Sequence, residues 1–218
     1  PGATNLATGL AQASAAYSPV VSIAGSLSSA HQYRDAFQEV DQQSLFKPIT
    51  KKTWTVTQTA RVPEMIREGF RTALTPRRGP VQLNIPRDIL SESADFGDFG
   101  SPELYRVHET PMGAADLISR AVAMLHGAAK PLIIAGGGIK QTNGAGSALA
   151  LAEALNAPIA TSPGHGDAIP CDHPLYTGQV GPRGNAVASR LAREADVILA
   201  LGTRLGFNTT FYSYDNIN

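Results

Sequence analysis

The stretch that decides the fold is Pro19-Val-Val-Ser-Ile-Ala-Gly25, a nearly continuous apolar run between a proline and a glycine. A short apolar run bounded by turn residues is typical of a strand that is buried on both faces of a parallel sheet. An alanine-rich helix is predicted before it, from Leu6 to about Tyr17. Beyond it, the apolar pattern predicts a strand, a helix and a strand, at 53–56, 62–75 and 80–85. The first 90 residues therefore predict an open, mostly parallel sheet flanked by helices.

The composition changes between Leu90 and Pro111 to Ser, Asp, Gly, Pro and Glu without periodicity, which is typical of a linker. From Met112 the alternation resumes, with helices expected at 114–126, 145–155 and 185–194 and strands at 131–135, 158–161 and 197–201. A long loop is expected from Ser162 to Arg183. The prediction is an α/β chain with two sheets: a first domain at 1–90, a linker at 91–111 and an incomplete Rossmann-like domain at 112–218.

Composition excludes several classes of function. The chain has 218 residues, of which 43% are hydrophobic, enough for one large or two small domains. Eighteen basic residues balance 18 acidic ones, so no basic field favours a nucleic acid or an anionic membrane. No apolar run approaches the roughly 20 residues that cross a bilayer. The single Cys171 fits a reducing compartment, and we expect a cytoplasmic protein.

Two segments of the first half carry candidate chemistry. Pro1-Gly-Ala-Thr-Asn5 forms a turn before a helix, where Thr4 or Asn5 can cap the helix and the backbone can approach a ligand. Phe37-Gln38-Glu39 lies in a loop that is longer than ordinary connections. An amide can pair with a heterocycle and an aromatic ring can close an apolar pocket around it. The structural alternatives are a well-capped helix, and a solvated loop with Phe37 in the core.

Four segments in order resemble the pyrimidine-binding domain of thiamine diphosphate-dependent enzymes of the acetolactate synthase group. They are Pro1 to Asn5, Pro19 to Gly25, Phe37-Gln38-Glu39 and Gly79-Pro-Val-Gln-Leu-Asn-Ile-Pro-Arg-Asp88. The resemblance implies that Pro1, Asn5 and Gln38 lie around the aminopyrimidine of thiamine diphosphate. It also implies substrate contacts by Phe37 and Arg87, with the cation attracting a 2-oxo acid carboxylate.

The resemblance further implies that the cofactor supplies the chemistry of 2-oxo acid decarboxylation and carboligation. In this family the activating glutamate, and the motif that holds magnesium and diphosphate, lie in segments that this sequence does not contain. We therefore expect a piece of a larger enzyme that is inactive alone, with Mg²⁺ ligands elsewhere, and we do not assign Glu39 the catalytic role. The family also implies a homodimer or homotetramer.

The second half carries Pro131 to Ala135 running into Gly136-Gly137-Gly138, a strand and glycine turn that can approach a phosphate. By the same resemblance this half is the central domain, so Gly136, Gly137 and Gly138 are candidate contacts of FAD or another nucleotide. The alternative is a purely structural turn.

The loop from Gly164 to Leu175 concentrates two His and two Asp, but it has no structural zinc pattern, and no metal ligand is assigned. This loop, with the segment from Ala195 to Leu205, resembles sulfoacetaldehyde acetyltransferase at least as well as acetolactate synthase. Such relatives are not FAD enzymes. Two rival functions therefore stay open: a sulfoacetaldehyde acetyltransferase-like enzyme, and a non-catalytic nucleotide-binding module.

Overall fold

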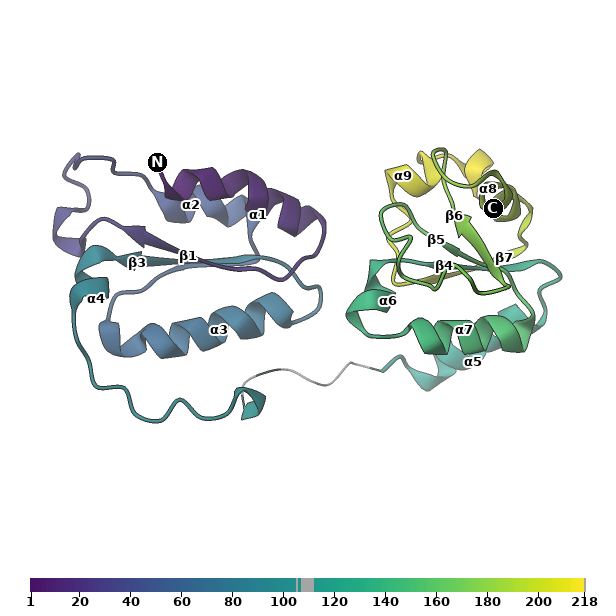
Figure 1. The fold of residues 1–218 in the computed structure, drawn as a ribbon, viewed down its shortest axis with the longest axis horizontal. Helices are drawn as coiled ribbons and strands as arrows, with labels where there is room; N and C mark the ends of the chain where they lie inside the picture. The colour runs from purple at the N-terminus through teal and green to yellow at the C-terminus, as the bar shows by residue number, and fades with distance from the viewer. Residues whose placement is uncertain (105, 107–111, 218) are drawn as a thin grey trace. The chain divides into compact units, whose positions relative to one another are not determined.

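The computed structural model describes residues 1–104, 106 and 112–217. It divides into two compact units, Pro1–Glu109 and Thr110–Asn218, each built on its own sheet (Figure 1). Among the described residues all strand pairings in the two sheets are parallel, and the strand order is β1-β3-β2 in the first unit and β6-β5-β4-β7 in the second. The predicted α/β class with two open, mostly parallel sheets is confirmed. The expected linker residues at 105 and 107–111 lie outside the described residues.

The elements of the first unit follow the expected alternation of helix and strand. In chain order they are η1 (Ala3–Asn5), α1 (Leu6–Ala15), β1 (Val21–Ser26), η2 (Ser29–His31), α2 (Gln42–Phe46), η3 (Lys47–Ile49), β2 (Lys52–Thr55), η4 (Thr59–Arg61), α3 (Val62–Leu74), β3 (Val81–Pro86), α4 (Arg87–Ser91) and η5 (Pro102–Leu104), where η marks a 3₁₀ helix.

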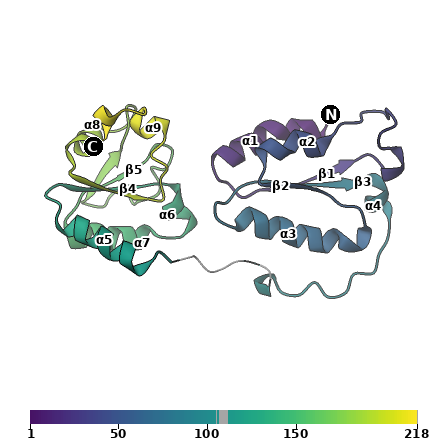
Figure 2. The ribbon, with the colours of Figure 1, turned by 180° about the vertical axis from the view of Figure 1, so that it is seen from behind.

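In this unit α1 and α2 cover one face of the sheet and α3 covers the other (Figures 1 and 2). The central strand β3 is buried along its whole length. Val81, Leu83 and Ile85 point toward α3 and form the apolar core there. Gln82 and Asn84 alternate with them and so face the α1 and α2 side, where the Gln82 amide donates to Asn84 Oδ1 at 3.0 Å.

The second unit contains, in chain order, α5 (Ala115–His126), β4 (Pro131–Ala135), α6 (Gly137–Gln141), α7 (Ala145–Leu155), β5 (Ile159–Thr161), β6 (Tyr176–Gln179), α8 (Ala186–Glu194), β7 (Val197–Leu201), α9 (Phe207–Thr210) and η6 (Tyr214–Asn216). Leu132 and Ile134 of β4 pack toward α8, whereas Ile133 and Ala135 pack toward α6 and α7. The alternation along β4 therefore supplies both halves of this core. In the described part of the chain, no helix combines the length and apolarity needed to cross a membrane.

Three short elements depart from the sequence prediction. The expected loop from Ser162 to Arg183 contains the edge strand β6, whose register with β5 is irregular and whose Gly178 has a φ of 94°. The loop of the first unit ends in the five-residue helix α2, with Asp41 as its cap. The glycines after β4 form the beginning of α6 rather than a free turn. These elements were missed because a few residues carry too little periodicity.

Candidate functional site

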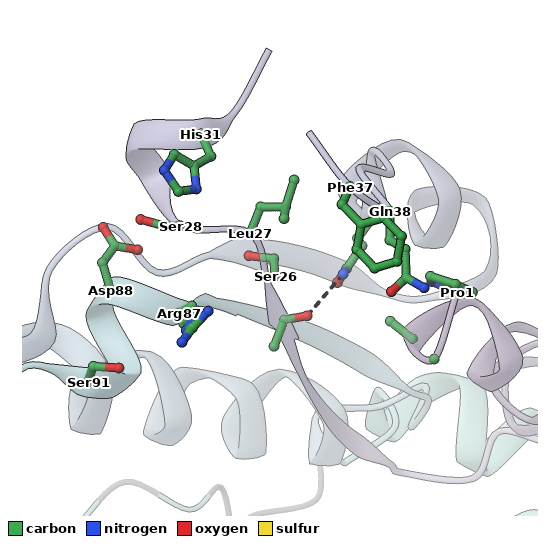
Figure 3. Close-up of a pocket in the computed structure, with 14 residues that line it drawn as sticks. Pro1, Ser26, Leu27, Ser28, His31, Phe37, Gln38, Arg87, Asp88 and Ser91 are labelled. Atoms are coloured by element: carbon green, nitrogen blue, oxygen red, sulfur yellow. Dashed lines mark hydrogen bonds between the residues drawn. The ribbon is translucent and has the colours of Figure 1, made fainter. Parts of the chain in front are cut away.

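A cavity of about 550 Å³ opens at the carboxyl edge of the first sheet, where ligands of open α/β folds collect. Three regions of the chain line it, as Figure 3 shows: the opening turn, the stretch from the end of β1 through the following loop to the start of α2, and α4. Its lining residues are Pro1, Gly2, Ala3, Gly25, Ser26, Leu27, Ser28, His31, Phe37, Gln38, Gln42, Arg87, Asp88 and Ser91. The parallel topology therefore brings the chemistry-bearing segments of the first half to one place.

The structure brings together four of the five residues that the sequence assigned to cofactor or substrate in this half. Pro1, Phe37, Gln38 and Arg87 all line the cavity. Asn5 does not line the cavity. It is an exposed residue at the junction between η1 and α1.

The helix cap expected from Thr4 or Asn5 is not formed, because no side chain of the opening turn caps α1. Instead the Thr4 hydroxyl donates to the Pro1 carbonyl at 2.6 Å. This bond shapes the turn at the cavity wall, so Thr4 satisfies its hydroxyl within the turn rather than at the helix N-terminus.

One end of the cavity combines an aromatic ring with amides. Phe37 is 85% exposed, which excludes the structural alternative that placed its ring in the core. Gln38 follows it with a φ of 62°, a left-handed conformation that few non-glycine residues adopt. In Figure 3 the Phe37 ring and the Gln38 amide lie near Pro1. The same segment borders a second cavity of about 420 Å³, which Gln38 also lines.

Two buried oxygen atoms on the cavity wall have no hydrogen-bond partner among the described residues. Gln42 donates through Nε2 to the Gly25 carbonyl at 3.0 Å, which leaves its Oε1 unpaired. The Ser26 hydroxyl is the second unpaired atom. A buried polar atom without a partner is costly, and a polar ligand or water that hydrogen-bonds to it removes this cost. Sequence analysis missed Ser26 and Gln42 because only the fold shows which polar atoms stay unpaired.

The other end of the cavity is ionic. No carboxylate of the described residues lies within ion-pair distance of Arg87, whose guanidinium points into the cavity in Figure 3. The neighbouring Asp88 accepts a hydrogen bond from the Ser29 N–H at 3.0 Å, and this bond holds the pKa of the Asp88 carboxyl below its ordinary value. Asp88 thus ties the base of the loop to α4, while Arg87 keeps its donors available for an anion.

The glycine segment of the second unit packs against the end of β7. Gly136 N–H donates to the Leu201 carbonyl and Gly138 N–H to the Gly202 carbonyl, both at 2.9 Å. A Cβ atom on Gly136 or Gly138 would lie 2.6 Å from Gly202 backbone atoms. This close approach accounts for glycine at both positions without any ligand. On Gly137, a Cβ atom would lie 2.7 Å from the His165 ring.

The His165 ring is close to Gly137 and to charged side chains. Lys140 and Asp167 form an ion pair at 2.7 Å. Partial burial, followed by the positive charge of Lys140, holds the pKa of His165 below its ordinary value. Across the described residues, no group of three or more His, Cys, Asp or Glu side chains is arranged to hold a metal ion.

Two family models match the chain, one in each unit. Residues 1–45 match the N-terminal TPP binding domain of thiamine pyrophosphate enzymes, and residues 118–218 match their central domain. The chain belongs to the thiamine pyrophosphate enzyme family. The acetolactate synthase-like resemblance read from the sequence is thereby confirmed at the level of the family.

Within this family the chain is similar to acetolactate synthase large subunits and to sulfoacetaldehyde acetyltransferases. It is 35% identical over 213 residues to a probable acetolactate synthase large subunit of Methanococcus aeolicus, covering 96% of this chain and 36% of that protein. It is 38% identical over 208 residues to a sulfoacetaldehyde acetyltransferase of Alcaligenes xylosoxydans xylosoxydans, covering 94% of this chain and 33% of that protein. The chain thus spans about a third of the length of the curated relatives it matches.

Proposed function

We propose that the chain is part of a thiamine diphosphate-dependent 2-oxo acid decarboxylase and carboligase of the acetolactate synthase type. Residues 1–90 would be the pyrimidine-binding part and residues 112–218 the central domain. The observation that carries the proposal is the convergence of Pro1, Phe37 and Gln38 on one cavity at the carboxyl edge of the first sheet. The match of residues 1–45 to a TPP binding domain supports the same assignment.

The residues of this cavity fit the aminopyrimidine half of the cofactor. The ring would contact Pro1 and Phe37, and the Gln38 amide would pair with its polar edge. The unpaired oxygens of Ser26 and Gln42 support this fit, because an exocyclic amino group offers donors to such acceptors. When bound, thiamine diphosphate supplies a nucleophilic carbon and an electron sink for decarboxylation.

The residues of this chain would bind and orient, rather than transfer protons. Arg87 would attract the carboxylate of a 2-oxo acid, because its guanidinium has no ion-pair partner among the described residues and offers paired donors. Phe37 would exclude water from the same end of the cavity. Magnesium, which the family implies, would by the same resemblance be held by residues outside this chain.

The test is a calorimetric titration of the longest available form of the protein with thiamine diphosphate in the presence of Mg²⁺, because by the family resemblance the segments that hold the diphosphate lie outside this chain. Replacing Gln38 by Ala should weaken binding by about fivefold, the effect of losing one hydrogen bond of about 1 kcal/mol. Gln58→Ala is the matched control, since Gln58 is exposed and lines none of the described cavities. Equal affinity of the Gln38→Ala and wild-type chains would contradict the proposal.

A sulfoacetaldehyde acetyltransferase-like activity is the second candidate, favoured by the 38% identity to such a protein. Product analysis of the longest available form of the protein distinguishes the two candidates. An acetolactate synthase-like enzyme converts pyruvate alone, whereas the rival requires sulfoacetaldehyde and phosphate.

FAD is not part of the proposal. Two of the three candidate glycine N–H groups are already donated to carbonyls of the chain, which leaves them no hydrogen for a pyrophosphate. The N–H groups of Gly136 and Gly138 are therefore not proposed as FAD contacts, and a flavin absorbance band in the purified protein would show that FAD binds through other groups. By the family resemblance we also propose a homodimer or homotetramer, which light scattering tests, and a cytoplasmic location, which fits the single cysteine.

A further inference from the structure

The segment that carries Phe37 and Gln38 has an unusual backbone. Tyr33, Asp35 and Gln38 have φ values of 62°, 53° and 62°, so three non-glycine residues within six positions are left-handed. Each such residue carries a conformational cost, and it persists only where the surroundings hold it. The segment therefore needs an interaction that offsets this cost.

Glu39 provides that interaction. Its Oε1 accepts the Tyr33 N–H at 2.6 Å and its Oε2 accepts the Ala36 N–H at 3.1 Å. Its own N–H donates to the Ala36 carbonyl at 3.0 Å. Successive N–H groups on a backbone of alternating handedness form a concave anion site, and here a carboxylate of the same loop fills it.

The carboxylate charge of Glu39 is thus stabilised by backbone N–H groups of its own loop. The hydrogen bonds from Tyr33 and then Ala36, with smaller contributions from Arg34 and Asp35, hold the pKa of the Glu39 carboxyl below its ordinary value. A carboxylate with both oxygens bound to backbone N–H groups is a poor proton acceptor. It does not line the cavity that Pro1, Phe37 and Gln38 share.

We propose that Glu39 is a positioning residue: by binding the backbone at 33–36 it fixes the loop that presents Phe37 and Gln38 to the cavity. This inference rests on the proposed function for its ligand, but the loop geometry stands on the contacts alone. It also assigns a task to the acid of the Phe-Gln-Glu segment that is different from proton transfer.

The informative variant is Glu39→Gln. The N–H groups of Tyr33 and Ala36 bind different oxygens of Glu39. A glutamine at this position would therefore place its NH₂ donor against one of these two N–H groups. Amide exchange at Tyr33 or Ala36 should become about tenfold faster or more, because one charge-assisted hydrogen bond is lost. Asp95→Asn is the control: it removes one charge from an exposed residue that has no hydrogen bond or ion pair among the described residues.

A double-mutant cycle then separates positioning from direct contact. Glu39→Gln should weaken thiamine diphosphate binding at least as much as Gln38→Ala does, because the loop presents both Phe37 and Gln38, and the double variant should bind no more weakly than Glu39→Gln alone. The melting temperature of Glu39→Gln should change little, because the loop is exposed. An unchanged melting temperature shows that the loss of affinity comes from local positioning and not from general destabilisation.

Three results would overturn the proposal. Unchanged exchange at both Tyr33 and Ala36 would show that Glu39 does not hold the loop. Fully additive losses of affinity would show that Glu39 acts on the ligand independently of Gln38. If the longest available form of the protein, with Mg²⁺ present, ignored thiamine diphosphate, the proposed function would be refuted and with it the ligand-binding part of the positioning role, while the exchange rates would still test the loop contacts of Glu39 separately.

Discussion

The packing of the glycine segment predicts opposite effects for two Gly→Ala substitutions in the same unit. A Cβ on Gly138 would lie 2.6 Å from Gly202 Cα and 3.1 Å from its carbonyl oxygen. These are backbone atoms, so no side-chain rotation relieves the overlap. A Cβ on Gly146, in the first turn of α7, would meet no atom within 4 Å.

The magnitudes follow from these contacts. For Gly138→Ala the overlap costs about 1–3 kcal/mol. Displacing the hydrogen bond from Gly138 N–H to Gly202 costs about 1 kcal/mol more. Alanine's higher helix propensity returns at most about 1 kcal/mol, so we expect a net loss of about 1–3 kcal/mol in the free energy of unfolding. Gly146→Ala has only the propensity term and should stabilise by up to about 1 kcal/mol.

Urea denaturation followed by circular dichroism measures both changes. Trp54, the single tryptophan of the chain, lies in the first unit, so its fluorescence follows the unfolding of that unit. Gly138→Ala should lower the midpoint of the dichroism transition, whereas Gly146→Ala should raise it slightly. If Gly138→Ala were as stable as Gly146→Ala, the structural explanation of the glycine segment would be wrong.

Two further predictions concern stability. Leu83→Ala removes a fully buried side chain from the core under α3 and should cost about 2–5 kcal/mol. Trp54 packs against the same core, so its fluorescence should report the lower urea midpoint, and an unchanged midpoint would contradict the assigned core. Asp196 accepts the N–H groups of Ala129 and Lys130 at 2.6 and 2.8 Å, and these two bonds hold its pKa below the ordinary value. Its stabilisation is therefore present above the unfolded-state pKa, near 3.9, and is lost as pH falls through the lower folded-state value. Asp196→Asn should be less stable than wild type at neutral pH, and the difference should shrink on acidification; a difference independent of pH would refute this role.

The long strands and helices were predictable because their sequences carry a clear period. The apolar run at β4 and the amphipathic α3 agree with the structure to within a few residues. By contrast, β6 consists of four half-buried residues, one of which is a glycine, and α2 depends on the Asp41 cap more than on any apolar pattern. Such elements exist because the completed fold offers them partners, which sequence alone does not show.

The same distinction applies to the site. The parallel topology made it predictable that the opening turn and the loop after β1 would meet at one edge of the sheet. The unpaired oxygens of Ser26 and Gln42 depend on which atoms the fold leaves without partners, and Glu39's contacts depend on a backbone conformation that residue types do not specify. Asn5 was assigned through the family resemblance, and its exposed position outside the cavity has no explanation in the described contacts.

The most direct test of the central claim is an NMR titration of the isotope-labelled protein, in its longest available form and with Mg²⁺ present, with thiamine diphosphate. If the cavity of the first unit holds the aminopyrimidine, the Gln38 side-chain amide and the backbone N–H groups of Gly2 and Ala3 should shift together and saturate. The Gln58 side-chain amide should stay in place. Shifts confined to Gly136–Gly138 and their neighbours, or no shift at all, would contradict the account.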